Sequence, residues 1–143
     1  MAERPRLTLE RHYAASPAQV FLAWTDPQLI ARWWVPGLDG GAVKAELDLR
    51  VGGRYRIHTR MPDGEEHAVG GVYREIEPPH RLVFTWAWQS TPERESLVTL
   101  AFAAEGGGTR LSLHHEGFFD EGARDRHAGG WQRALDAFDV LFA

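Results

Sequence analysis

The side chain best suited to proton chemistry is His115, which lies in the segment TRLSLHHEGF. Alternation places His115 on the same face of a predicted strand as Leu111 and Leu113. His114 therefore points to solvent. A desolvated histidine beside a pocket can exchange a proton near neutral pH, although a core histidine hydrogen-bonded to a neighbour is the more common arrangement. His127, on the apolar face of the predicted C-terminal helix, is a second histidine that could face such a pocket.

Other chemistries find little support. The chain has no cysteine, which excludes disulfides, thiolate metal sites and a cysteine nucleophile. No serine lies in a G-x-S-x-G turn, and the adjacent histidines at 114 and 115 cannot chelate one ion from opposite sides of a strand. Arg11 shares a face with Leu7 and Leu9, so we expect it to pair with a buried acid or to meet an anionic ligand group. We expect no catalytic set, no metal and no cofactor.

The composition is that of an ordinary globular protein with one unusual feature. Of 143 residues, 43% are hydrophobic and 25% are charged, the net charge is −4, and Lys44 is the only lysine. Because there is no basic cluster, we do not expect binding to nucleic acid. No apolar run approaches the roughly 18 residues of a membrane span, and the N-terminus has no apolar signal core, so we expect a cytoplasmic protein. The unusual feature is the six tryptophans.

Periodicity divides the chain into the order β, α, α, six β and one long α. Residues 6–13 alternate as a strand, and Ser16 and Asp26, each followed by proline, begin two short helices. Six alternating segments follow from about residue 43 to residue 118, and paired glycines among them fit turns or bends that curl a sheet. From about residue 120, apolar residues recur at steps of three and four, which is typical of a helix of roughly 20 residues.

The adjacent tryptophans Trp33 and Trp34 stand at the end of the second short helix. Successive side chains of a helix point about 100° apart, so the two rings cannot share one narrow apolar face. We expect one of them to anchor the helix on the core and the other to be partly exposed over the mouth of a pocket. The sequence does not show which is which. Pro36 and Gly37 are expected to end the helix.

Antiparallel strands joined by short hairpins, with one long amphipathic helix, predict an α+β protein. We expect residues 1–143 to form a single domain, in which a curved seven-stranded antiparallel sheet wraps around the C-terminal helix. The two short helices, between strands one and two, would close one end of a cavity. The candidates to line it are Trp33, Trp34, Tyr55, Ile57, Trp86, Trp88, His115, Phe118, Trp131 and Phe138. Core filling is the simpler role for most of them.

Five segments carry a family resemblance: SPAQVFLAWTDPQLIARWW, VGGRYR followed by PDG, EIEPPHRLVFTW, GGGTRLSLHHEGF and GGWQRALDAFDVL. In this order they resemble the activator of heat shock protein 90 ATPase homologue family. The resemblance spans about residues 7–142. It implies membership of the SRPBCC superfamily, with its START-like, Bet v 1-like helix-grip fold, and an association with the stress response. It also implies a cavity between sheet and long helix, commonly for a small apolar or aromatic ligand.

Three functions are compatible with the sequence. The favoured one is binding of a small apolar or aromatic molecule without chemistry, because aromatic residues are abundant and a catalytic set is lacking. The first alternative is a cyclase- or hydrolase-like enzyme in which His115 is the acid or base and Arg11 or a tyrosine orients the substrate. The second, implied by the resemblance, is a chaperone-associated protein, although the separate N-terminal domain of the eukaryotic co-chaperone is not found here. Homodimers are common in the helix-grip class, but no outward apolar stripe requires one.

Overall fold

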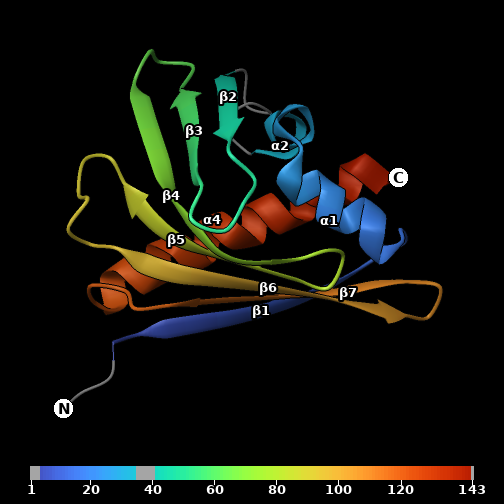
Figure 1. Cartoon of the computed structure of the whole chain (residues 1–143). Coiled ribbons are helices and arrows are strands. Elements are labelled where there is room, and N and C mark those ends of the chain that lie inside the picture. Colours follow the sequence, from blue (N-terminus) through green and yellow to red (C-terminus); the bar gives the residue numbers. More distant parts are fainter. Residues whose placement is uncertain (1–3, 35–40, 143) are drawn as a thin grey trace.

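The computed structural model describes residues 4–34 and 41–142, which form a curved sheet, helices and a short 3-10 helix (Figure 1). The strands and longer helices follow the order predicted from the periodicity. In chain order the elements are β1 (Arg6–Tyr13), α1 (Pro17–Thr25), α2 (Pro27–Trp33), β2 (Ala42–Leu47), β3 (Arg54–Arg60), β4 (Glu66–Glu77), β5 (Arg81–Trp88), β6 (Ser96–Glu105), β7 (Gly108–Glu116), α4 (Glu121–Phe138) and η1 (Asp139–Phe142).

The strands form one antiparallel sheet in the order β1-β7-β6-β5-β4-β3-β2. The first strand therefore joins the last one at one edge, and β2 forms the other edge. In Figure 1, β2, β3 and β4 stand at a steep angle to β1, β6 and β7, so the sheet is strongly curved, and α4 runs across one of its faces. This arrangement confirms the predicted α+β helix-grip fold with a seven-stranded sheet.

The pairing of β4 with β5 contains an irregularity that helps the sheet to curve. A bulge between Tyr73 and Glu75 shifts the register of the two strands. Nearby, Gly71 approaches β5 so closely that a Cβ would overlap the carbonyl oxygen of Thr85. The next backbone N–H, that of Val72, donates to the Thr85 hydroxyl (2.8 Å). Bulges and close glycine contacts bend strands locally, which agrees with the predicted role of the paired glycines.

The helices begin at the predicted residues. Ser16 caps α1 in a capping box: the Gln19 N–H donates to the Ser16 hydroxyl (3.2 Å), and the Ser16 N–H donates to the Gln19 side chain (2.9 Å). Asp26 caps α2 and Asp120 caps α4, each by accepting a backbone N–H of the first turn (2.9 and 2.7 Å). These caps fix the points at which the chain turns from extended backbone into helix.

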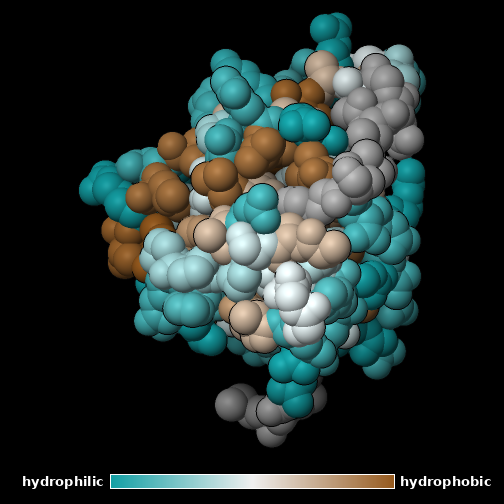
Figure 2. All heavy atoms as spheres, turned by 90° about the vertical axis from the view of Figure 1, so that its right-hand side faces the viewer, coloured by the Kyte–Doolittle hydropathy of each residue, from teal (hydrophilic) through white to brown (hydrophobic). Residues whose placement is uncertain are grey.

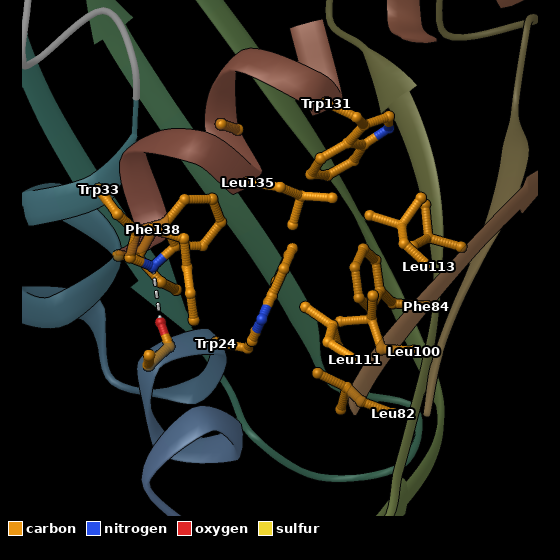
Figure 3. Close-up of a cluster of buried hydrophobic side chains, with 14 of the residues drawn as sticks. Trp24, Trp33, Leu82, Phe84, Leu100, Leu111, Leu113, Trp131, Leu135 and Phe138 are labelled. Carbon is orange, nitrogen blue, oxygen red and sulfur yellow. Dashed lines mark hydrogen bonds between the residues drawn. The ribbon is translucent and has the colours of Figure 1, made fainter. Parts of the chain in front are cut away.

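The core lies between the sheet and the helices (Figure 3). Trp131, Leu135 and Phe138 project from α4 toward the sheet at the predicted helical spacing. The Phe138 ring centroid lies 5.1 Å from that of Trp33 in α2 and 5.8 Å from that of Trp24 in α1, so all three helices meet there. The labelled sheet residues that face them are Leu82, Phe84, Leu100, Leu111 and Leu113.

The expectation that Trp33 or Trp34 is partly exposed is wrong, because both are buried, with exposed fractions of 1% and 8%. α2 ends at Trp33, and the extended backbone of Trp34 (φ −66°, ψ 119°) turns its side chain away from the helical direction. The Trp33 indole N–H donates to the carbonyl of Ala23 (2.8 Å; Figure 3). Trp34 instead faces Trp86, with 6.1 Å between ring centroids. The expected helix end at 36–37 lies outside the described residues.

The surface in Figure 2 is largely hydrophilic, with hydrophobic side chains gathered in one part of the face shown. Among the described residues, the large hydrophobic side chains that are exposed are Leu22, Leu49, Val51 and Phe119. The Phe119 ring is partly covered by the Arg94 guanidinium, 3.9 Å from its centroid, as in a cation–π contact. In the described part of the chain, no helix has both the length and the apolar character needed to cross a membrane.

Candidate functional site

A cavity of about 400 Å³ opens between α4 and the sheet. The helix lines it with residue pairs at 126–127, 130–131 and 133–134, because steps of three and four return to the same side of a helix. Gly130 lies in the middle of this side, and a Cβ there would meet no atom within 4 Å. The glycine therefore leaves space that a larger side chain would enter. The lining residues are Trp34, Met61, Trp86, Trp88, Arg126, His127, Gly130, Trp131, Arg133 and Ala134.

Four tryptophan rings form most of the apolar wall. The ring centroid of Trp86 lies 5.0 Å from that of Trp131 and 5.7 Å from that of Trp88. Trp34 completes the group, 6.4 Å from Trp131. The contacts are tilted or perpendicular, which is the arrangement that the charge distribution of aromatic rings favours. The residue that follows α2, together with β5 and α4, thus supplies one aromatic wall.

A second cavity of about 20 Å³ shares Trp34, Trp86 and Trp131 with the first. Its volume suffices for about one water molecule. Trp24 and Trp86 both line it, and the buried indole N–H of each has no hydrogen-bond partner among the described residues. A buried donor without a partner costs about 1–3 kcal/mol. Of these two tryptophans, Trp86 also belongs to the aromatic wall of the larger cavity.

His115 is completely buried, and both nitrogens of its ring are hydrogen-bonded. The Trp131 indole N–H donates to Nδ1 (3.0 Å), so the ring proton is assigned to Nε2. Nε2 then donates to the Ser96 hydroxyl (2.7 Å), which itself donates to the carbonyl of Trp86 (3.1 Å). Burial is the main cause that lowers the pKa of His115 to about 2, and the nearby His127 adds to it. The neutral ring holds Trp131 in a fixed orientation.

His127 lines the larger cavity and makes an equivalent pair of bonds. The Trp88 indole N–H donates to Nε2 (3.0 Å), and Nδ1 donates to the carbonyl of Ala123 (2.7 Å). Burial lowers the pKa of His127, while the bond to the Ala123 carbonyl acts in the opposite direction. The ring centroids of His127 and His115 lie 5.5 Å apart. The two histidines thus orient two indoles of the cavity wall, Trp88 and Trp131.

The ten residues predicted to face a cavity fall into three groups. Those that line the larger cavity are Trp34, Trp86, Trp88 and Trp131. Those that line the smaller of these two cavities but not the larger are Trp33, Tyr55 and Ile57. Those that line neither, and are buried elsewhere in the core, are His115, Phe118 and Phe138. The structure therefore brings four of the predicted residues together at the larger cavity, while three lie outside both cavities.

Arg126 and Arg133, which line the larger cavity on either side of Gly130, were not predicted from the sequence. Arg126, Gly130 and Arg133 follow one another at steps of four and three, in the row of α4 residues next to the apolar row. Their spacing therefore indicates that they share one side of the helix. Their polar or small character pointed to solvent instead. Met61 was also missed, because it directly follows the last residue of β3, where alternation no longer indicates direction.

Arg11 and His115 do not meet at a common site. Arg11 forms an ion pair with Asp136 of α4 (3.6 Å between nitrogen and oxygen), but the Asp136 side chain is largely exposed, so this acid is not the buried partner that was expected. Neither Arg11 nor His115 lines the two cavities described above. Within residues 4–34 and 41–142, no group of three or more His, Asp or Glu side chains is placed to hold a metal ion.

A curved seven-stranded antiparallel sheet around a long C-terminal helix defines the helix-grip class of α+β proteins. Residues 14–143 match the family model described as Activator of Hsp90 ATPase homolog 1-like protein. The chain belongs to this family. A comparison with curated proteins found no significant match.

Solved structures show the same fold. Protein CV1439 from Chromobacterium violaceum superposes with a TM-score of 0.86 at 30% identity, over 96% of both chains. The AHSA1-like protein from Aeromonas hydrophila gives a TM-score of 0.80 at 30% identity, over 95% of this chain and 90% of that one. CalU16 from Micromonospora echinospora gives 0.73 at 29% identity, over 96% of this chain and 76% of that one. These similarities confirm the resemblance inferred from the sequence.

Proposed function

We propose that this protein binds a small apolar or aromatic molecule in the cavity between the sheet and α4, without a chemical step. The observation that carries the proposal is an opening of about 400 Å³ whose wall contains four indoles. Small-molecule sites are typically clefts of about 300–1,000 Å³ lined mainly by apolar and aromatic side chains. The family fold is compatible with this function.

The geometry gives less support to acid–base catalysis. His115, the acid or base of the enzyme alternative, is fully buried and bonded at both ring nitrogens. His127 does line the cavity, but its nitrogens are bonded to Trp88 and to the carbonyl of Ala123. A general acid or base must reach the substrate with the atom that carries or takes the proton. Binding without chemistry therefore fits these contacts better.

The test uses the fluorescent, uncharged probe N-phenyl-1-naphthylamine and two matched variants of α4. Gly130 lines the cavity and Gly129 does not, yet a Cβ at either position would meet no atom within 4 Å. Replacing either glycine by leucine should stabilise the helix by about 1 kcal/mol. Only Gly130→Leu places its side chain in the cavity. We expect the wild type and Gly129→Leu to bind the probe alike, and Gly130→Leu to bind it at least about tenfold more weakly.

Thermal unfolding of the three proteins shows whether the variants remain folded. A wild type that does not bind the probe would contradict the proposal. So would equal binding by Gly129→Leu and Gly130→Leu, because the probe would then occupy another part of the surface.

A further inference from the structure

We propose that the molecule bound in this cavity is an aromatic acid, with its ring among the tryptophans and its carboxylate beside Arg126 and Arg133. This inference rests on the proposed function and names the chemical class that the cavity selects. It follows from three observations: the hydrogen-bonding character of the lining, its charge, and the position of the arginines around Gly130.

The first observation is that the described lining offers donors and almost no acceptors. It contains no Asp, Glu, Asn, Gln, Ser, Thr or Tyr side chain, and the thioether of Met61 is only a weak acceptor. Both nitrogens of His127 are already bonded within the protein. The indole N–H of Trp86, by contrast, is buried and has no partner in the described part of the chain. A ligand that brings acceptor atoms suits such a lining, whereas a ligand rich in donors leaves the donors of both sides unpaired.

The second observation is that the charge at the opening is positive. Arg126 and Arg133 are the lining residues that carry a permanent charge, and Arg126 forms no ion pair with any described residue. The burial of His127 lowers its pKa, so its ring is neutral near neutral pH and the positive charge of the lining comes from the arginines. An anionic group at this rim therefore meets the charge of Arg126, which no acidic side chain of the described residues pairs with.

The acidic side chains of α4 that form ion pairs do so outside the cavity lining. Asp125 pairs with Arg124 (3.1 Å), and Asp136 pairs with Arg11 on β1 (3.6 Å). Neither acid lines the opening. The positive rim is therefore not cancelled by these neighbours on the same helix.

The third observation is the spacing of the two arginines. They are seven residues apart on α4, or about 10 Å along the axis, with Gly130 between them. Because glycine has no side chain and no atom lies within 4 Å of the position of its Cβ, an open gap lies between the two arginines at the cavity wall. Guanidinium forks bind carboxylates through paired hydrogen bonds, more specifically than an ammonium group does. The indoles beside this gap supply a surface for a flat ring.

The experiment compares two molecules of nearly equal shape, 2-naphthoate and its uncharged amide, 2-naphthamide, as competitors of N-phenyl-1-naphthylamine at pH 7.5. We expect 2-naphthoate to displace the probe at about a tenfold lower concentration than the amide, the size expected for charge-assisted bonds at a rim. Higher salt should reduce this ratio, because exposed charges are screened. The cationic analogue 2-naphthylmethylamine should be the weakest competitor of the three.

Variants of the two arginines test whether these side chains cause the preference for the acid over the amide. Arg126→Gln should lower the acid-to-amide ratio about threefold, the scale of one exposed ion pair, and Arg126→Gln/Arg133→Gln should lower it close to one. The matched control is Arg124→Gln, which removes the same charge from the same helix outside the cavity and should leave the ratio unchanged. Thermal unfolding confirms that each variant is folded.

Equal displacement by acid and amide, or a ratio that survives the double substitution, would overturn the assignment of an aromatic acid. Such results would leave the proposed apolar binding site intact, provided that the uncharged probe still binds and Gly130→Leu still blocks it. Failure of the probe itself to bind would instead remove the site on which this inference rests.

Discussion

Removal of the imidazole at position 115 should change how the stability of the protein depends on pH. In the folded protein, burial lowers the pKa of His115 to about 2 from an ordinary value of 6.5. The unfolded chain therefore binds a proton on this ring at a pH at which the folded protein does not. Stability supplied by the neutral ring is complete above about pH 6.5 and is lost progressively as the pH falls toward the folded pKa.

The magnitude follows from the difference in proton binding. Between the two pKa values, each pH unit costs about 1.36 kcal/mol of unfolding free energy. From pH 7.5 to pH 4.5 the loss due to His115 is about 2.7 kcal/mol, and it depends only on the folded pKa being well below 4.5. His127, whose pKa burial also lowers, adds a loss of the same sign.

The assay is urea unfolding followed by tryptophan fluorescence at several pH values, for the wild type and for His115→Gln. Glutamine retains a donor and an acceptor but does not titrate, so the variant should lose about 2.7 kcal/mol less than the wild type over this range. The carboxylates are common to both proteins, so their contribution cancels in the difference. Parallel profiles for the two proteins would refute the reasoning.

A second measurement covers the case in which His115→Gln does not fold. The ring proton signals of His115 in the wild type, followed by NMR, should remain those of a neutral imidazole down to at least pH 4.5. A shift of these signals centred near pH 6.5 would show that the buried ring titrates normally and would equally refute the argument.

Two further substitutions probe the sheet and the core, each by the same urea assay. Gly71→Ala should destabilise the protein by about 2–3 kcal/mol, because its Cβ would overlap the backbone of Thr85 across the β4–β5 pair, whereas Gly129→Ala, in open space on α4, should stabilise it by up to about 1 kcal/mol. Phe138→Ala should cost about 3–5 kcal/mol, since its fully buried ring joins α4 to the two short helices, and a loss below 1 kcal/mol would show that this junction is not a tight core.

The sequence predicts most of the fold because the strands and helices have strong local signals. Ser16 and Asp26 lie in capping positions that short-range hydrogen bonds confirm, and strand alternation correctly assigns Trp86 to the interior. The direction of Trp34 could not be predicted from helical geometry, since α2 ends one residue earlier and the backbone becomes extended. Local pattern fails at such an end because side-chain direction depends there on φ and ψ of a single residue.

The membership of the candidate site could not be fully predicted from the sequence for a similar reason. Alternation correctly turns His115 inward, but it cannot distinguish a residue in the cavity wall from one layer behind it. That distinction depends on how far α4 stands from the sheet, which is a tertiary property. Arg126 and Arg133 reach the opening because Gly130 leaves it vacant between them, and their residue types alone indicate only a solvated helix face.

The two histidines whose pKa burial lowers are hydrogen-bonded to indoles of the cavity wall. Trp131 and Trp88 each donate an indole N–H to a neutral histidine, and each ring forms part of the cavity wall. Rings held in this way lose little conformational freedom when a ligand packs against them, which favours a site formed before binding. Protonation of either histidine would take away the acceptor of its indole. Acidification should therefore weaken binding of the uncharged probe in the still folded protein, and His127, the less deeply buried ring, should respond before His115.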